Sequence, residues 1–236
     1  MTSSLRSEPE MLLAEFDEYA TNYKQVVAES IRITGESSEY FAAYKADYIA
    51  RKIAPAPGTK VLDYGCGIGL LSAQIRKRLP QLRIDGFDVS KHSVEQVEPA
   101  LHSQGTFTTD QNQLLSAYDV IVLANVLHHV NPNERTSLLR QVSSRLARNG
   151  RIVVFEHNPL NPLTRHAVSQ CPFDEGVQLL PVREARGYFG EGFEGVTRDY
   201  VVFFPRWLSW LRPFEGFLSW CPLGAQYAVV ASGRLT

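Results

Sequence analysis

The order of apolar and helical segments constrains the fold of this chain more than any other feature. Short apolar runs alternate with segments whose apolar residues recur at helical spacing. The expected strands are 60–64, 83–88, 106–109, 119–124, 151–156, 197–204 and 226–231, and the expected helices between them are 70–79, 93–102, 133–147, 164–170 and 182–189. Because strands that alternate with helices build a mostly parallel sheet covered on both faces, we expect an α/β, Rossmann-like doubly wound fold with seven strands.

Two parts are expected along the chain. Residues 1–54 should form an N-terminal helical cap, with two helices within 12–53 separated at 35–38, where glycine suits a helix end and serine the next helix start. A Pro/Gly-rich break at 55–58 then opens a main domain over 55–236. Inside that domain, Asn149 and Gly150 are expected to stop the helix over 133–147.

Charge and cysteine usage exclude several classes of protein. A net charge of -1 without a dense basic run gives no general attraction to DNA or RNA, so we expect no nucleic-acid partner. The three cysteines are widely spaced and form no CxxC or Cys/His motif, so we expect no metal site and a reducing, cytoplasmic location. No stretch approaches the roughly 20 apolar residues that span a bilayer.

The segment 61–69, Val-Leu-Asp-Tyr-Gly-Cys-Gly-Ile-Gly, is an apolar strand that runs into a glycine turn before a helix. Such a turn lets the backbone approach a nucleoside cofactor, and the helix that follows presents free amide groups. A dinucleotide loop usually reads G-x-G-x-x-G, but Leu70 occupies the last glycine position here. Asp63 would also repel a pyrophosphate, whereas it would attract the ammonium group of a methionine moiety.

This D-x-G-C-G-x-G pattern resembles motif I of the class I S-adenosylmethionine (SAM)-dependent methyltransferases of the UbiE/UbiG-like, small-molecule type. The resemblance extends through 86–90, 118–130 and 150–156 and covers roughly residues 55 to 235. It implies SAM as cofactor and a last strand that is antiparallel. The implied cofactor contacts are Asp63, Gly65, Cys66, Gly67, Gly69, Asp88, Val89, Asp110, Asn125 and, from the cap, Tyr23.

Within this resemblance, Asp88 stands in place of the acid that binds both ribose hydroxyls, and Asp110 in place of the residue that contacts the adenine amino group. Alternatively, Asp88 caps the next helix and Asp110 is an ordinary loop acid. The family commonly uses N-terminal helices as a lid over cofactor and acceptor. Tyr19, Tyr23 and Tyr40 therefore either reach the site, with Tyr19 and Tyr40 at the acceptor, or belong to aromatic stripes of the core.

The candidate chemistry lies at the carboxyl ends of the fourth and fifth strands, where open α/β sheets bind ligands. His128 and His129 are candidate general bases there, although a His-His pair also caps helices or packs on cofactors. Glu156, His157 and Asn158 form the expected acceptor-binding segment. The nearby Asn161 is either a further substrate contact or a helix cap, and Cys171 is expected to be structural.

All three tryptophans fall within 206–220, interleaved with Phe, Leu and Arg. We interpret 205–224 as an aromatic insertion that forms either a lid, a dimer contact or a peripheral membrane contact through 206–220. Pro213 argues against one continuous helix.

The sequence thus predicts a SAM-dependent methyltransferase acting on a small-molecule or glycan- or lipid-precursor acceptor, with oxygen as the expected methylated atom. Its rivals are a non-catalytic regulatory or scaffold module that binds SAM or its demethylated product, and a nicotinamide-dependent oxidoreductase. The missing third glycine argues against the oxidoreductase.

Overall fold

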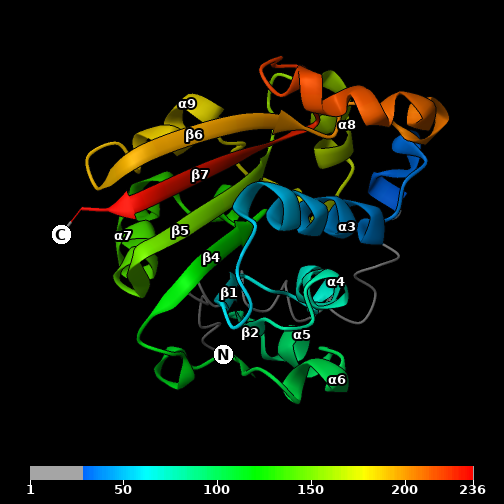
Figure 1. Ribbon diagram of the computed structural model, residues 1–236. Coiled ribbons are helices and arrows are strands. Elements are labelled where there is room, and N and C mark those ends of the chain that lie inside the picture. Colours follow the sequence, from blue (N-terminus) through cyan, green and yellow to red (C-terminus); the bar gives the residue numbers. More distant parts are fainter. Residues whose placement is uncertain (1–28, 236) are drawn as a thin grey trace, which may run out of the picture.

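The computed structural model describes residues 29–235, which form a seven-stranded sheet with helices on both faces (Figure 1). The strand order is β3-β2-β1-β4-β5-β7-β6, and β7 runs antiparallel to both of its neighbours. The strands are β1 Lys60–Tyr64, β2 Arg83–Phe87, β3 Phe107–Thr108, β4 Tyr118–Ala124, β5 Leu146–His157, β6 Phe193–Val201 and β7 Gln226–Arg234. The predicted doubly wound α/β fold with an antiparallel last strand is therefore confirmed.

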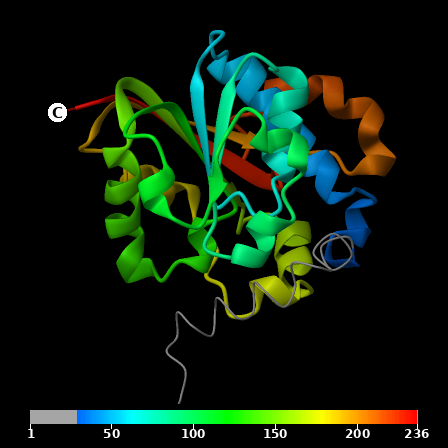
Figure 2. The ribbon, with the colours of Figure 1, turned by 90° about the horizontal axis from the view of Figure 1, so that it is seen from below.

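Helices cover both faces of the sheet (Figure 2). A hydrophobic core lies on each face. Successive residues of β5 alternate between them, because side chains along a strand point to opposite faces: Ile152 belongs to one core and Val153 to the other. The helices are α3 Ser38–Tyr48, α4 Leu70–Arg78, α5 Lys91–Glu95, α6 Pro99–His102, α7 Pro132–Ser144, α8 Pro162–Ser169 and α9 Val182–Gly187. Helices α3 and α4 contribute to one core, and α7 and α9 to the other.

Two expected helices end differently in the structure. The segment 93–102 is split into α5 and α6, because Pro99 starts a new helix instead of continuing the first. Helix α7 ends at Ser144, so the prediction that Asn149 and Gly150 stop this helix is wrong. Both residues lie in β5, whose pairing with β4 shifts register between Tyr118 and Val120. Leu146 is buried as the first residue of β5, so the strand has already begun before Asn149 and Gly150.

The described part of the N-terminal segment packs on the sheet rather than standing apart from it. Gly35 adopts φ +70° and ends the 3₁₀ turn η1 Arg32–Thr34, and the Ser37 side chain accepts a bond from the amide of Tyr40 at the start of α3. Ala46 and Ile49 are buried in the same core as the sheet. Tyr19 and Tyr23 lie outside the described residues.

The aromatic insertion forms η6 Arg206–Leu218 between β6 and β7. It is a 3₁₀ segment interrupted by non-helical dihedrals at Leu208 and contains Pro213. Figures 1 and 2 place it (orange) near the start of α3, where Arg212 donates to Glu36. Within residues 29–235, no helix combines the length and apolar character that a membrane crossing requires.

Candidate active site

A cavity of about 750 Å³ opens at the carboxyl ends of β1, β2, β4 and β5 and is covered by α3. Its wall combines the glycine turn after β1, the end of β2, the loop after β4 and the segment after β5. Parallel strands point their carboxyl ends toward one edge, so residues distant in sequence meet there. The predicted residues that line it are Asp63, Gly65, Cys66, Gly67, Asp88, Val89, Asn125, His128, His129, His157 and Tyr40.

The glycine turn is tied to the end of β2 by backbone hydrogen bonds. The amides of Gly65 and Cys66 both donate to the carbonyl of Phe87. Gly65 has φ +78°, and a Cβ there would lie 2.5 Å from Cγ2 of Val126. Only glycine fits this conformation and this approach. Gly69 lies outside the cavity wall, where it opens α4 with φ +78°.

Asp63 is buried at the wall of the cavity. Its Oδ2 accepts a hydrogen bond of 2.7 Å from Oγ of Ser72. Burial raises the pKa of the Asp63 carboxyl to about 6, aided by repulsion from Asp88 and opposed by the Ser72 bond and by Lys45. A carboxylate held in this way gains most from a cationic ligand that enters beside it.

Asp88 joins the glycine turn to the loop after β2. Its Oδ2 accepts from the Gly67 amide at 2.7 Å, and its Oδ1 accepts from the Ser90 amide at 2.9 Å. Ser90 caps α5, so Asp88 is not the cap residue itself. Because a carboxylate oxygen accepts more than one bond, both oxygens can still receive ribose hydroxyls. Val89 lies at the rim with 54% of its surface exposed, as a residue that covers a planar ring would.

Asp110 does not line the cavity. Its Oδ1 accepts from the backbone amide and the side-chain amide of Asn112, and Asp110 thereby caps the turn η3 Gln111–Gln113. Thr109 lines the cavity in its place. The structure therefore favours the ordinary loop acid over the expected adenine contact, because the short side chain is turned into its own loop.

Lys45 is a site residue that the sequence did not reveal. It lies on α3, is only 5% exposed and lines the cavity with Asp63. Burial lowers the pKa of the Lys45 ammonium to about 8, although the Glu156 and Asp63 carboxylates oppose the shift. A lysine on a helix is ordinarily solvated, so no spacing along the chain signals this burial.

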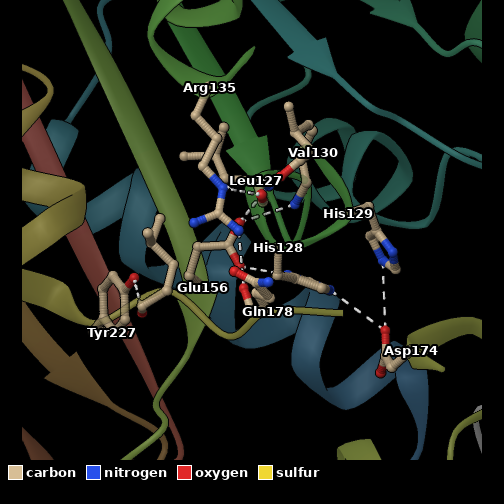
Figure 3. A network of polar contacts seen from close by, with 11 residues as sticks. Leu127, His128, His129, Val130, Arg135, Glu156, Asp174, Gln178 and Tyr227 are labelled. Atoms are coloured by element: carbon tan, nitrogen blue, oxygen red, sulfur yellow. Dashed lines mark hydrogen bonds and ion pairs between the residues drawn. The ribbon is translucent and has the colours of Figure 1, made fainter. Parts of the chain in front are cut away.

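Three imidazoles and one carboxylate on the cavity wall form a group that we call the imidazole cluster: His128, His129, His157 and Asp174. Figure 3 shows His128, His129 and Asp174 of this cluster. Oδ1 of Asp174 lies 3.5 Å from Nε2 of His128 and 3.5 Å from Nε2 of His129. The rings of His128 and His157 have centroids 5.1 Å apart. Asp174 was missed by the sequence analysis, since η5 Pro172–Asp174 meets this edge only through folding.

Glu156 supports the cluster from behind and does not line the cavity. Its Oε1 accepts from the amides of Val126 and Leu127, and its Oε2 lies 2.5 Å from Nδ1 of His128. Figure 3 shows the buried Arg135 of α7, which donates to the carbonyls of Leu127 and Val130 on the same loop. The expected acceptor contact by Glu156 is thus replaced by a positioning role, because both of its oxygens are engaged inside the protein.

The charges within the imidazole cluster give its three histidines different pKa values. Burial lowers the pKa of His128, but the Glu156 and Asp174 carboxylates outweigh it and raise this pKa to about 9. Burial and the charge of His128 lower the pKa of His129 to about 3 and that of His157 to about 4. At neutral pH, His128 is therefore charged, whereas the rings of His129 and His157 are neutral.

Asn158 is buried behind the cavity wall. Its Nδ2 donates to the carbonyls of Pro222 and Gly224, and its Oδ1 accepts from the Leu160 amide. The expected substrate contact is therefore wrong for Asn158, whose side chain instead anchors the end of the aromatic insertion. Asn161 caps α8 through the Thr164 amide, which is the structural alternative considered from the sequence, but it also lines the cavity.

Three buried side-chain oxygens at the cavity have no hydrogen-bond partner among residues 29–235. They are Oη of Tyr40, Oδ1 of Asn125 and Oε1 of Gln226. Buried polar atoms nearly always have a partner, so these three indicate where polar groups of a ligand bind. Gln226 was not predicted, because nothing in its local sequence distinguishes it. Cys171 also lines the cavity.

The fold and the site together define a Rossmann-like domain that binds a nucleoside carrying a cationic group. Residues 62–152 match the family model described as a methyltransferase domain. The chain is 28% identical over 118 residues to the ubiquinone biosynthesis O-methyltransferase of Aeromonas salmonicida, which covers 47% of this chain and 48% of that protein. It is 25% identical over 122 residues to ribosomal RNA small subunit methyltransferase C of Vibrio parahaemolyticus, covering 48% and 36%.

Solved structures share the fold over nearly the whole chain. Magnesium protoporphyrin IX methyltransferase of Synechocystis, with S-adenosylhomocysteine (SAH) bound, matches with a TM-score of 0.66 at 17% identity, covering 95% of this chain and 99% of that one. A SAM-dependent methyltransferase of Archaeoglobus fulgidus matches with a TM-score of 0.64 at 15% identity, covering 87% and 97%.

These findings support a class I SAM-dependent methyltransferase, the class that the glycine motif predicts, with SAM as its cofactor. The chain spans about half the length or less of the curated relatives it matches.

Proposed function

We propose that this chain transfers the methyl group of SAM to an oxygen atom of a small-molecule or lipid-linked acceptor. The observation that carries the proposal is that the acidic glycine turn and the imidazole cluster line the same cavity. The cavity volume of about 750 Å³ falls in the upper part of the range for small-ligand sites. It is therefore suited to a nucleoside and an acceptor bound side by side.

In this proposal, SAM lies along the glycine turn. Asp63 pairs with its ammonium group, and Lys45 with its carboxylate, since both charges are buried at the same wall. Asp88 accepts the ribose hydroxyls, and Val89 covers the adenine ring. Asn125, in a left-handed conformation with φ +60°, presents its unpartnered Oδ1 to the same ligand.

The acceptor then lies between the methyl group and the imidazole cluster. Methyl transfer from a sulfonium is an in-line displacement, in which holding the two reactants in position supplies about 7–11 kcal/mol. An acceptor hydroxyl must also lose its proton. His129 is the proposed proton acceptor, because its ring lines the cavity and its Nε2 lies 3.5 Å from Oδ1 of Asp174, which can stabilise the imidazolium that forms. Tyr40 and Gln226 offer unpartnered oxygens for polar groups of the acceptor.

A nucleic-acid acceptor is less well supported, although five of the curated relatives are ribosomal RNA methyltransferases by name. RNA binding draws most of its affinity from neutralising phosphates with Lys and Arg. This chain has 24 basic and 25 acidic residues, so it offers no excess of positive charge.

The test is calorimetry with SAM and SAH, followed by a screen for SAH release with hydroxylated small molecules, lipid-linked sugars and ribosomal RNA. His129→Gln should lower kcat by roughly 10²–10⁴-fold without changing the affinity for SAM. His166→Gln, on an exposed position of α8, is the matched control. Binding of SAM without SAH release from any acceptor would favour the non-catalytic module, and binding of NADH instead of SAM would favour the oxidoreductase.

The aromatic insertion supports a lipid-linked acceptor. We define its aromatic face as Trp207, Trp210, Phe214, Phe217, Trp220 and Leu223, each between 56% and 77% exposed. Side chains three residues apart lie one above the other on a 3₁₀ helix. Phe214 and Phe217 in η6 have this spacing, and Trp220 and Leu223 follow the helix in the turns before β7.

A lipid bilayer is the proposed partner of this face. The only carboxylate between Tyr200 and Gln226 is Glu215, which is buried and accepts from the amides of Phe203 and Phe204. Arg206 is exposed beside the tryptophans. An aromatic surface with a positive charge and no exposed acid is suited to anionic headgroups. Because the cavity wall also includes Phe203 and Phe204, an acceptor in the membrane would lie close to the cavity.

Vesicle binding tests this partner. Every tryptophan of the chain lies on the aromatic face, so intrinsic tryptophan fluorescence reports on that face alone. We expect a blue shift with phosphatidylglycerol vesicles and co-sedimentation that is lost in Trp207→Ser/Trp210→Ser. Leu235→Ser, which removes an exposed leucine elsewhere, is the control. Absence of a shift, with self-association or a protein partner bound by this face instead, would refute membrane contact.

A further inference from the structure

The imidazole cluster contains a set of ligand atoms with the spacing of a metal site. One nitrogen each from His128 and His157 and one oxygen from Asp174 lie within 4.8 Å of one another. Two ligand atoms that are each about 2.1 Å from a tetrahedral ion lie about 3.4 Å apart. The distance between Nε2 of His128 and Oδ1 of Asp174 is 3.5 Å, which is long for a hydrogen bond but fits two ligands of one ion.

The residues behind His128 provide the support that a metal-binding histidine requires. Ligating histidines usually donate their second ring nitrogen to a carboxylate, which fixes the ring and its tautomer. Nδ1 of His128 lies 2.5 Å from Oε2 of Glu156, which leaves Nε2 directed toward Asp174. Glu156 is itself held by the amides of Val126 and Leu127. The ligand is therefore oriented before any ion binds.

We propose that His128, His157 and Asp174 bind a divalent transition-metal ion, which holds the acceptor oxygen beside the methyl donor; only this last role rests on the proposed function. Two imidazoles and one carboxylate suit iron, zinc or a similar ion rather than magnesium or calcium. Three protein ligands leave coordination positions open, as catalytic sites require. All three ligands line the cavity, so those positions face the ligand space.

The expectation of no metal site came from cysteine and histidine spacing along the chain. The three ligands come from the turn η4 Leu127–His129, the end of β5 and the turn η5, which are distant in sequence. Only the meeting of these segments at the sheet edge brings their ligand atoms together.

In the proposed reaction, His129 is the base and is not one of the three metal ligands. An ion held by these ligands would polarise the acceptor hydroxyl oxygen and lower its pKa, and the proton would pass to the ring of His129, which lines the same cavity. The oxygen then forms a bond to the methyl carbon while the carbon–sulfur bond breaks. The electron pair of that bond stays on sulfur, so the sulfonium becomes the neutral thioether of SAH. His129 later releases its proton to water.

Metal binding can be measured without any acceptor. Protein treated with chelator is titrated with Zn²⁺ by calorimetry, and Co²⁺ is added to record the visible absorption bands of a coordinated ion. We expect one equivalent of metal. His157→Ala and Asp174→Asn should weaken binding more than Glu156→Gln, whose expected loss is about 10–100-fold as for other residues that support a ligand. His166→Ala is the matched control, because His166 is exposed on α8.

Measuring the SAM affinity of each ligand variant distinguishes a lost metal site from a misfolded protein. The ligand variants should still bind SAM, which shows that they fold, because Asp63 and Asp88 are not among the three ligands. Metal binding without methyl transfer would leave the site standing and overturn the proposed function. No stoichiometric uptake by the wild-type protein, or uptake unchanged in His157→Ala, would overturn the metal site. His128 would then serve as an imidazolium between two carboxylates.

Discussion

Replacing Asp63 with asparagine should change cofactor binding and stability in opposite directions. Burial raises the pKa of this carboxyl from 3.8 to about 6, and one pKa unit corresponds to about 1.4 kcal/mol. The ionised carboxylate therefore destabilises the free protein by about 3 kcal/mol at neutral pH. An asparagine side chain at this position would carry no charge and would still accept from Ser72. Loss of the attraction to Lys45 offsets part of the gain.

The sign of the pH dependence follows from the direction of the shift. A raised carboxyl pKa means that the folded protein holds the proton more tightly than the unfolded chain does. The penalty therefore grows as the pH rises from about 4 to about 6 and is constant above that. Asp63→Asn should be more stable than wild type at pH 7.5, by at most about 3 kcal/mol, and the difference should disappear near pH 4.

In contrast to stability, SAM binding should be weaker in Asp63→Asn than in the wild-type protein. Removing one member of a buried charge pair costs about 2–5 kcal/mol, so SAM affinity should fall by about 30-fold or more. Wild-type affinity should also weaken as the pH falls below 6, whereas the variant should show no such dependence. Urea unfolding at the two pH values and calorimetry with SAM provide the measurements. Asp110→Asn, an acid outside the cavity, is the control. A variant that is less stable at pH 7.5 and keeps its affinity would refute the reasoning.

Three further substitutions test other parts of the site. Lys45→Met should weaken SAM binding by about 2 kcal/mol or more in calorimetry, whereas Lys52→Met, at an exposed lysine, should not. Gly65→Ala places a Cβ 2.5 Å from Val126 at φ +78°, so it should destabilise the protein by about 1–3 kcal/mol and lower the thermal midpoint; an unchanged midpoint would contradict the packing. Asn158→Ala leaves two carbonyls without their donor, so urea unfolding should show a loss of about 1–3 kcal/mol with unchanged acceptor KM.

The first strands were predictable because each is a short apolar run that ends at a turn, whereas β6 begins and ends before the predicted 197–204 strand because its sequence is largely polar. The predicted 60–64 strand matches β1, and 83–88 matches β2 to within one residue. Errors arose where burial competed with a local signal. Asn149 and Gly150 have the composition of a helix end, but pairing of Leu146 with Tyr118 brings them into β5. Local composition cannot reveal that pairing.

The cofactor half of the site was predictable because it is continuous in sequence. Asp63 and the three glycines after it lie within seven consecutive residues. A strand followed by a glycine turn can bind few kinds of ligand. The acceptor half was predicted only in part. Asn158 and Glu156 were assigned to the acceptor because they follow a strand, yet their side chains point into the protein and hold other segments in place.

The sequence by itself determined the fold class, the family and the cofactor, since periodicity and a short motif are properties of neighbouring residues. Tertiary structure decided which polar side chains face the cavity. Lys45 comes from α3, Asp174 from η5 and Gln226 from β7, and all three meet at one edge of the sheet. The physical reason is that burial and charge depend on the surroundings in space, which chain neighbours do not specify.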